Sequence, residues 1–284
     1  MVAGDLPTVA SLRASTEEVL GDAAEARWIC EVAFAHRPLT EILHETVTER
    51  MVAHLDAMVA RRRSGEPLQY VLGEWSFRRL DLAVDRRVLI PRPETEWVAG
   101  RAIDLALEID GDRLVVDLGT GSGAIGLAIA DELPLDGTAV WLTDVDPEAL
   151  EVARANLAGI GRAARNVTIA EGRWFDALPE SLRADVIVSN PPYVAVGDAQ
   201  LDAEVLEWEP SRALFAGPDG LDDLREIISG ASSHLRRGGW LVCEIGSDQG
   251  VAVAEIARSV GLVEVSVEAD PAGHDRILVA RCAQ

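Results

Sequence analysis

The sequence of 284 residues predicts an α/β protein with a small α-helical bundle over residues 1–72, a β-hairpin linker over residues 73–90 and a larger domain over residues 91–284. Three changes of pattern along the chain predict this organisation. Apolar residues recur at helical spacing up to about residue 72, and short, partly alternating apolar runs follow. From Arg113 onward, strand-like and helix-like segments alternate. Such alternation is typical of a parallel sheet that is covered by helices on both faces.

The first part of the chain is expected to hold four helices. Ser15-Thr16-Glu17-Glu18 resembles an N-cap signature, and a second helical pattern covers residues 23–35. Thr40 is expected to cap a longer helix whose apolar stripe reaches Val59. Because glycine ends helices readily, Ser64-Gly65 is expected to stop it.

After residue 72, a β-hairpin is expected between residues 73 and 90, and a helix that ends near residue 109 is expected to follow it. Strands are expected at 114–118, 139–144, 167–170, 185–189 and 240–245. Helices are expected at 124–132, 147–158, 221–235 and 250–260. Two further strands, at 262–267 and 276–280, have no helical pattern between them. They are therefore expected to pair in antiparallel fashion at the sheet edge, which brings the sheet to seven strands.

The composition narrows the classes of function. The formal net charge is −22, no lysine occurs, and most of the acidic excess follows residue 90. Such a field repels a phosphate backbone, so no stable nucleic-acid binding is expected, although solvation alone also explains the acidity. Cys30, Cys243 and Cys282 form neither a disulfide framework nor a metal pattern, so no metal is expected. No apolar run resembles a signal peptide or approaches the roughly 18 residues of a membrane span, so a cytoplasmic protein without membrane contact is expected.

A glycine-rich segment follows the first expected strand of the sheet. Gly119-Thr120-Gly121-Ser122-Gly123 comes directly after Asp117-Leu118 and opens a helix, so its backbone can approach a ligand closely. Asp144, roughly 20 positions further on, is placed to bind ribose hydroxyls. This spacing also fits a dinucleotide site, which keeps a nicotinamide oxidoreductase as an alternative. The overlapping D-x-G-x-G-x-G pattern is the one that S-adenosylmethionine (SAM) enzymes use. Trp174, after the third strand, either fills the core or stacks on an adenine ring.

The segment Asn190-Pro191-Pro192-Tyr193 ends another expected strand. Two consecutive prolines stop both helix and ladder, so the segment forms a rigid, extended corner with free carbonyl oxygens. The Asn190 side-chain carbonyl and the Pro191 backbone carbonyl can accept both hydrogens of an amide or amino nitrogen, orient its lone pair and stabilise developing positive charge. Tyr193 supplies a planar wall. The corner is predicted to hold the nitrogen that receives a methyl group.

The glycine loop, Asp144 and the proline corner resemble those of the SAM-dependent amino-methyltransferases, which include DNA adenine, rRNA guanine and protein glutamine enzymes. EPLQYVLG at 66–73, LIPRPETE at 89–96, and segments at 209–214 and 217–221 resemble only the protein-(glutamine-N(5)) methyltransferases of peptide-chain release factors, the HemK/PrmC family. The resemblance runs from about residue 60 to the end. An amino-methyltransferase that acts on rRNA or DNA bases, and a non-catalytic helical adaptor, remain as alternatives.

The resemblance implies a Rossmann-like seven-stranded SAM-dependent methyltransferase sheet with an antiparallel last strand and a helical N-terminal substrate-recognition domain. It implies that the substrate is the glutamine of the Gly-Gly-Gln motif in class-1 peptide-chain release factors. It also implies two sets of binding residues, with Asn190 and Pro191 as the catalytic ones. The SAM-binding set is Gly119, Thr120, Gly121, Ser122, Gly123, Asp144, Trp174 and Asn190. The glutamine-binding set is Asn190, Pro191, Pro192 and Tyr193.

Three features are not accounted for by this resemblance. Arg173 stands where the family often carries an acid, so recognition of the adenine amino group is expected to fall to another group. Arg92 is expected either to pair with the SAM carboxylate or to cap a helix. Residues 194–218 lack a periodic signal, and since a loop of this length is usually functional, a lid over the glutamine is expected there.

Overall fold

The chain forms two compact units in the computed structural model, which describes residues 7–34, 36–198 and 201–283. The first unit comprises Met1–Glu74 together with Ala203–Trp208, and the second comprises Trp75–Asp202 and Glu209–Gln284. Each unit has hydrophobic core residues of its own. No described helix is both long and apolar enough to cross a membrane.

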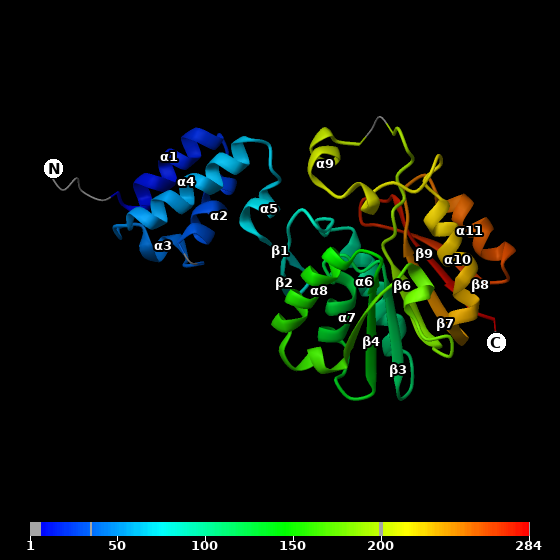
Figure 1. Ribbon diagram of the computed structural model, residues 1–284. Helices are drawn as coiled ribbons and strands as arrows, with labels where there is room; N and C mark the ends of the chain where they lie inside the picture. Colours follow the sequence, from blue (N-terminus) through cyan, green and yellow to red (C-terminus); the bar gives the residue numbers. More distant parts are fainter. Residues whose placement is uncertain (1–6, 35, 199–200, 284) are drawn as a thin grey trace. The chain divides into compact units, whose positions relative to one another are not determined.

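The first unit is helical, as predicted, but its described residues before residue 73 form five helices where four were expected (Figure 1). Its core includes the buried side chains of Ile29, Phe34, Leu55 and Met58. The helices are α1 (Val9–Leu20), α2 (Ala23–Ala33), α3 (Leu39–Ile42), α4 (Glu49–Arg63), α5 (Leu68–Leu72) and α9 (Ala203–Trp208).

The start of α1 differs from the sequence prediction. Its N-cap is Thr8, whose side chain accepts a hydrogen bond from the Ser11 amide. Ser15-Thr16-Glu17-Glu18 therefore lies inside the helix, and the prediction that it caps a helix is wrong. The predicted stop at Ser64-Gly65 is confirmed, because α4 ends at Arg63.

The prediction that Thr40 caps a long helix is wrong, because Thr40 lies inside the short helix α3, whose N-cap is Pro38. The short helix α3 ends at Ile42, and α4 begins only after Thr48, whose side chain caps it by accepting from the Met51 amide. Between the two, the carbonyl oxygen of Leu43 accepts a hydrogen bond from the first turn of α1. Pairing with α1 thus replaces the hydrogen bonds that a continuous helix would have made.

The segment from residue 194 to 218, expected as one long loop, contains α9 and the short 3-10 helix η3 (Ser211–Ala213). Glu204 of α9 lies 3.6 Å from the guanidinium of Arg62, which also pairs with Glu25 at 2.8 Å. These contacts tie α9 to the helical unit. Six residues show less than two turns of helical periodicity, which is why the sequence pattern did not indicate this helix.

The second unit begins with the predicted hairpin. The strands β1 (Glu74–Phe77) and β2 (Leu80–Ala83) form a two-stranded sheet and are joined by Arg78 and Arg79. The Arg78 guanidinium forms an ion pair with Glu132 at the end of a helix of the main domain. The proline-rich segment then leads into α6 (Thr95–Leu107), as predicted.

The main sheet has seven strands in the order β5-β4-β3-β6-β7-β9-β8. Neighbouring strands from β5 to β7 are parallel, whereas β9 is antiparallel to both β7 and β8. The predicted sheet and its antiparallel last strand are confirmed. The strands are β3 (Arg113–Leu118), β4 (Thr138–Asp144), β5 (Val167–Glu171), β6 (Ala184–Ser189), β7 (Leu235–Glu244), β8 (Val263–Ala269) and β9 (Asp275–Arg281).

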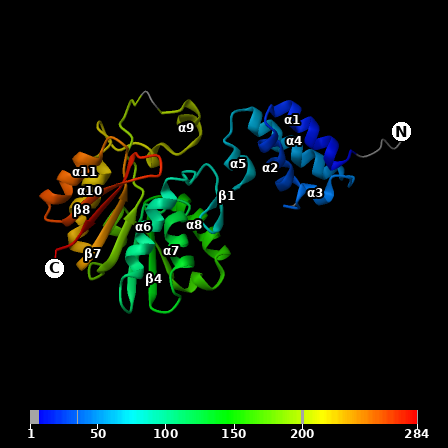
Figure 2. The ribbon, with the colours of Figure 1, turned by 180° about the vertical axis from the view of Figure 1, so that it is seen from behind.

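Helices cover both faces of this sheet (Figures 1 and 2). Successive residues of a strand point to opposite faces, so Val115 joins the core cluster that contains α6 and α7, while Val116 joins the one that contains α10 and α11. The remaining helices are α7 (Ala124–Glu132), α8 (Pro147–Gly159), α10 (Asp222–His234) and α11 (Gly250–Ser259).

The strand order reverses beside β3, which has β4 on one side and β6 on the other. In open α/β sheets this reversal opens a crevice at the carboxyl ends of the strands. Leu118 of β3 is in register with Thr143 of β4 and with Ser189 of β6. The segments that follow these three strands therefore start side by side.

Candidate active site

A cavity opens at these strand ends within the second unit. It is lined by eight of the predicted site residues, Gly119, Thr120, Gly121, Ser122, Asp144, Trp174, Asn190 and Pro192. Gly123, Pro191 and Tyr193, which were also predicted, are not among its lining residues. Further lining residues that the sequence did not indicate include Arg87, Val88, Thr95, Arg212 and Asp223.

The glycine loop owes its path to left-handed backbone conformations. Gly119 has φ 70° and Gly121 has φ 56°, values that strain any residue with a Cβ. A Cβ on Gly119 would lie 2.9 Å from the Trp174 ring, whereas one on Gly121 would meet no atom within 4 Å. The Gly121 amide donates a hydrogen bond of 2.9 Å to Asp144 Oδ2. The loop is thus packed against Trp174 on one side and open at Gly121.

Asp117, at the end of β3, stabilises the glycine loop through hydrogen bonds. It is 1% exposed, and its Oδ2 accepts hydrogen bonds from Thr120 Oγ1 at 2.5 Å and from the Gly126 amide at 2.9 Å. Burial raises the pKa of this carboxyl to about 7, against the opposing effect of the two hydrogen bonds. Asp144 accepts from two backbone amides, yet burial raises the pKa of its carboxyl as well.

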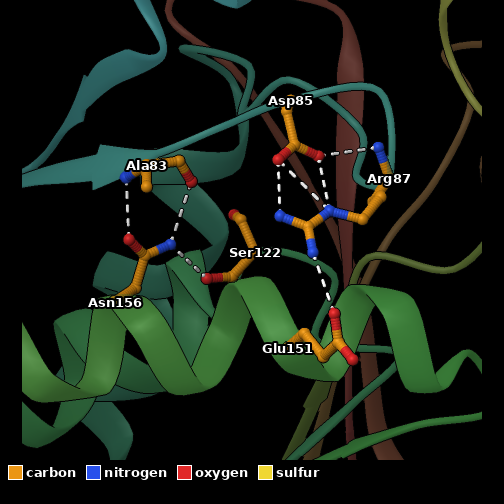
Figure 3. Close-up of polar contacts among 6 residues, drawn as sticks. All are labelled: Ala83, Asp85, Arg87, Ser122, Glu151 and Asn156. Carbon is orange, nitrogen blue, oxygen red and sulfur yellow. Dashed lines mark hydrogen bonds and ion pairs between the residues drawn. The ribbon is translucent and has the colours of Figure 1, made fainter.

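The hairpin supports the same loop through Asn156 of α8 (Figure 3). The Asn156 side chain accepts from the Ala83 amide at 2.7 Å and donates to the Ala83 carbonyl at 3.0 Å. Its Nδ2 also donates to the Ser122 carbonyl at 2.8 Å. A few residues further along, Arg87 pairs with Asp85 and with Glu151 of α8. The linker strand, α8 and the glycine loop are therefore held together by one buried amide.

Trp174 is confined beside the loop. It is 8% exposed, has a left-handed φ of 44°, and its Nε1 finds no hydrogen-bond partner among the described residues. The neighbouring Arg173 pairs with Asp223 at 2.8 Å and with Glu226 at 2.6 Å. The carboxylate of Asp223 is thereby held at the cavity wall near Trp174.

The proline corner is anchored by side chains from distant parts of the chain. Asn190 Nδ2 donates to Thr95 Oγ1 at 3.1 Å, and Thr95 Oγ1 donates to Glu244 Oε2 at 2.7 Å. The Tyr193 hydroxyl donates to Glu244 Oε1 at 3.2 Å, and the Tyr193 carbonyl accepts from Gln249 Nε2 at 2.9 Å. Burial raises the pKa of the Tyr193 hydroxyl far above its usual value, so it stays a donor.

Arg92 lies on the segment that leads into α6 and forms an ion pair of 2.5 Å with Glu209. The Glu209 side chain is 2% exposed and also accepts a hydrogen bond from the Ile90 amide at 3.1 Å. The expectation that Arg92 caps a helix is wrong: its guanidinium fastens the segment after α9 to the chain before α6.

Comparison with known proteins gives two matching family models. Residues 102–207 match the methyltransferase small domain, and residues 9–73 match the PrmC N-terminal domain. A release factor glutamine methyltransferase of Vibrio cholerae is 40% identical over 96% of this chain and 96% of its own length. One of Xylella fastidiosa is 42% identical over 96% of this chain and 98% of its own length. Among solved structures, a methyltransferase from Pyrococcus furiosus matches the fold with a TM-score of 0.52 and 20% identity, covering 72% of this chain and 90% of that one.

Proposed function

Since the chain belongs to the family of release factor glutamine methyltransferases, we propose that it transfers a methyl group from SAM to the side-chain amide nitrogen of the glutamine in the Gly-Gly-Gln motif of class-1 peptide-chain release factors. The structural observation that carries this proposal is the register of Leu118 with Ser189. It brings the glycine loop and the proline corner to one cavity, so a cofactor and a substrate nitrogen can meet there.

The residues of the cavity fit SAM. The left-handed glycines leave the backbone near Gly121 open to a ligand, and the Asp144 carboxylate is suited to ribose hydroxyls. The flat ring of Trp174, which lines the cavity, suits stacking on a flat heteroaromatic ring. Gly119, Thr120, Gly121, Ser122, Gly123, Asp144, Trp174 and Asn190 are the residues proposed to hold it. When bound, SAM supplies an activated methyl group on a sulfonium.

Asn190 and Pro191 are proposed to act on the glutamine. An amide nitrogen is a weak nucleophile because its lone pair is delocalised into the carbonyl. The Asn190 Oδ1 and the Pro191 carbonyl would each accept one of its hydrogens, which turns the lone pair toward the incoming carbon and stabilises the positive charge that develops. Pro192 and Tyr193 would wall the side chain. No general base is needed, since the protonated amide loses its extra hydrogen to water.

The helical unit is proposed to recognise the release factor. It matches the PrmC N-terminal domain, and it has a core of its own apart from the cavity-bearing unit. The strongly acidic second unit disfavours rRNA or DNA as the substrate. Because release factors act in translation, the proposal also places the protein in the cytoplasm.

The decisive experiment is incubation of the protein with labelled SAM and a purified class-1 release factor. We expect the Gly-Gly-Gln peptide to gain the mass of one methyl group on its glutamine. A release factor in which that glutamine is replaced by alanine serves as the control and should remain unlabelled. Label on rRNA alone, with none on the release factor, would contradict the proposal.

A further inference from the structure

A buried chain of hydrogen bonds runs from Glu244 at the end of β7, through Thr95 at the start of α6, to Asn190 after β6. The two bonds measure 2.7 Å and 3.1 Å, and they join residues that are 149 and 95 positions apart in the sequence. Glu244 is 1% exposed and Thr95 is 4% exposed. Thr95 and Asn190 also line the cavity, so the chain connects a fully buried carboxylate to the cavity wall.

The donors and acceptors along this chain allow one arrangement while Glu244 is ionised. A carboxylate only accepts, so the single hydroxyl hydrogen of Thr95 must point to Glu244. The Thr95 oxygen is then left as an acceptor toward Asn190. The Asn190 amide must turn its NH2 group to Thr95, because its oxygen would meet an acceptor there. Its Oδ1, which accepts no hydrogen bond from the described residues, is thereby directed away from Thr95.

We infer that Thr95 and Glu244 are positioning residues that fix the orientation of the Asn190 amide, so that a carbonyl oxygen and not an NH2 group meets the substrate nitrogen. The inference rests on the proposed methyl transfer to a glutamine, whose nitrogen needs acceptors and would be repelled by a second donor. Thr95 acts through Asn190, and Glu244 acts through Thr95.

Protonation of Glu244 would remove the constraint. A neutral carboxylic acid can donate to Thr95, which frees the Thr95 hydroxyl to donate to Asn190 Oδ1 and reverses the amide. Burial raises the pKa of Glu244 to about 7, and the nearby charge of Glu94 acts in the same direction. The hydrogen bonds from Thr95 and Tyr193 and the charge of Arg276 oppose this rise. The fraction of correctly oriented Asn190 should therefore fall as the pH drops through the neutral range.

The test compares Thr95→Val with Thr95→Ser in steady-state methylation of the release factor, at saturating SAM. Valine keeps the volume of threonine but has no hydroxyl, and serine keeps the hydroxyl. We expect Thr95→Val to lower kcat at least about tenfold and Thr95→Ser to retain kcat within about threefold. The SAM-dependent rise in melting temperature should persist in both variants, because the glycine loop is untouched.

Further variants distinguish a positioning role of Thr95 from a general loss of stability or packing. Thr138→Val removes a buried hydroxyl that has no partner in the described part of the chain, from a residue that is 7% exposed and lies at the opposite end of the sheet. It should keep the wild-type kcat. The acidic limb of the wild-type pH profile of kcat should persist in Thr95→Ser and vanish in Thr95→Val. Adding Glu244→Gln to Thr95→Val should cause little further loss, because the carboxylate is already disconnected from Asn190.

Several results would contradict a positioning role for Thr95 and Glu244. Wild-type kcat in Thr95→Val, or a loss that excess SAM restores, would overturn the inference. An acidic limb that is unchanged in Thr95→Val would do the same. If Thr95→Val does not fold, Thr95→Ala takes its place with the same expectations. A wild-type protein that methylates no release factor would instead reject the proposed function.

Discussion

Asn156 of α8 and Ser122 of the glycine loop are joined by a hydrogen bond of 2.8 Å from the Asn156 Nδ2 to the Ser122 carbonyl oxygen (Figure 3). The same side chain makes two hydrogen bonds with the backbone of Ala83 in the hairpin. Asn156 is 6% exposed and Ser122 is 3% exposed, so the hydrogen bond between them is shielded from water. The conformation of the proposed cofactor loop thus depends on the hairpin as well as on the sheet.

Replacement of Asn156 by leucine should loosen the glycine loop. Leucine leaves the carbonyl of the buried Ser122 without its partner and removes both hydrogen bonds to the Ala83 backbone, which should cost about 2 kcal/mol of folding free energy. The Kd for SAM, measured by calorimetry, should rise about tenfold, since the loop is no longer preorganised. Asn166→Leu is the matched control, because Asn166 also donates to a backbone carbonyl, that of Leu135, but far from the cavity. An equal loss of SAM affinity in both variants would refute this role of Asn156.

Alanine at Gly119 should abolish SAM binding. The residue has φ 70°, and a Cβ there would come within 2.9 Å of the Trp174 ring, so both the backbone and the wall of the cavity must shift. Gly111→Ala provides the comparison: its φ is 83°, and a Cβ there meets nothing within 4 Å. Both variants should lose about 1–2 kcal/mol for the left-handed conformation. Only Gly119→Ala should lose the SAM-dependent rise in melting temperature.

Removal of the Asn190 side chain should separate binding from chemistry. The Asn190→Ala variant loses the carbonyl that is proposed to accept a hydrogen of the glutamine amide, while the glycine loop and Asp144 remain. We expect methyl transfer to the release factor to be abolished and SAM affinity to stay within a few-fold of wild type. Retention of most of the activity would remove Asn190 from its proposed role.

The stability of the protein should carry a pH dependence from Asp117. Because burial raises the folded-state pKa of this carboxyl to about 7, above its unfolded value of 3.8, the folded protein binds the proton more tightly. The contribution of Asp117 to stability is therefore full below about pH 4 and declines as the pH rises toward 7. The free energy of unfolding in urea should be measured for wild type and for Asp117→Asn at pH 5 and pH 8. The value for Asp117→Asn minus the value for wild type should be larger at pH 8 than at pH 5. A difference that does not vary with pH would contradict this expectation.

Much of the fold follows from local sequence alone. The alternation of strand and helix patterns after residue 113 predicted all seven strands of the main sheet, because inner strands buried on both faces are short apolar runs and the helices between them are longer segments without that pattern. The glycine pattern and the consecutive prolines likewise act on their own backbone. Eight of the predicted site residues consequently line one cavity.

Contacts between distant segments decided the rest. Thr40 and Thr48 are equally good helix caps in sequence, and only the pairing of the intervening residues with α1 selects Thr48. Asn156 and Glu244 stand in ordinary helical and strand positions, and Thr95, although it lies in the segment LIPRPETE, was given no role of its own by the sequence. Their importance arises when the sheet register and helix packing bring each to a polar group far along the chain, where burial makes an unmet hydrogen bond costly. The sequence by itself determined the elements and the chemistry available at their ends; the tertiary structure alone decided which buried groups orient that chemistry.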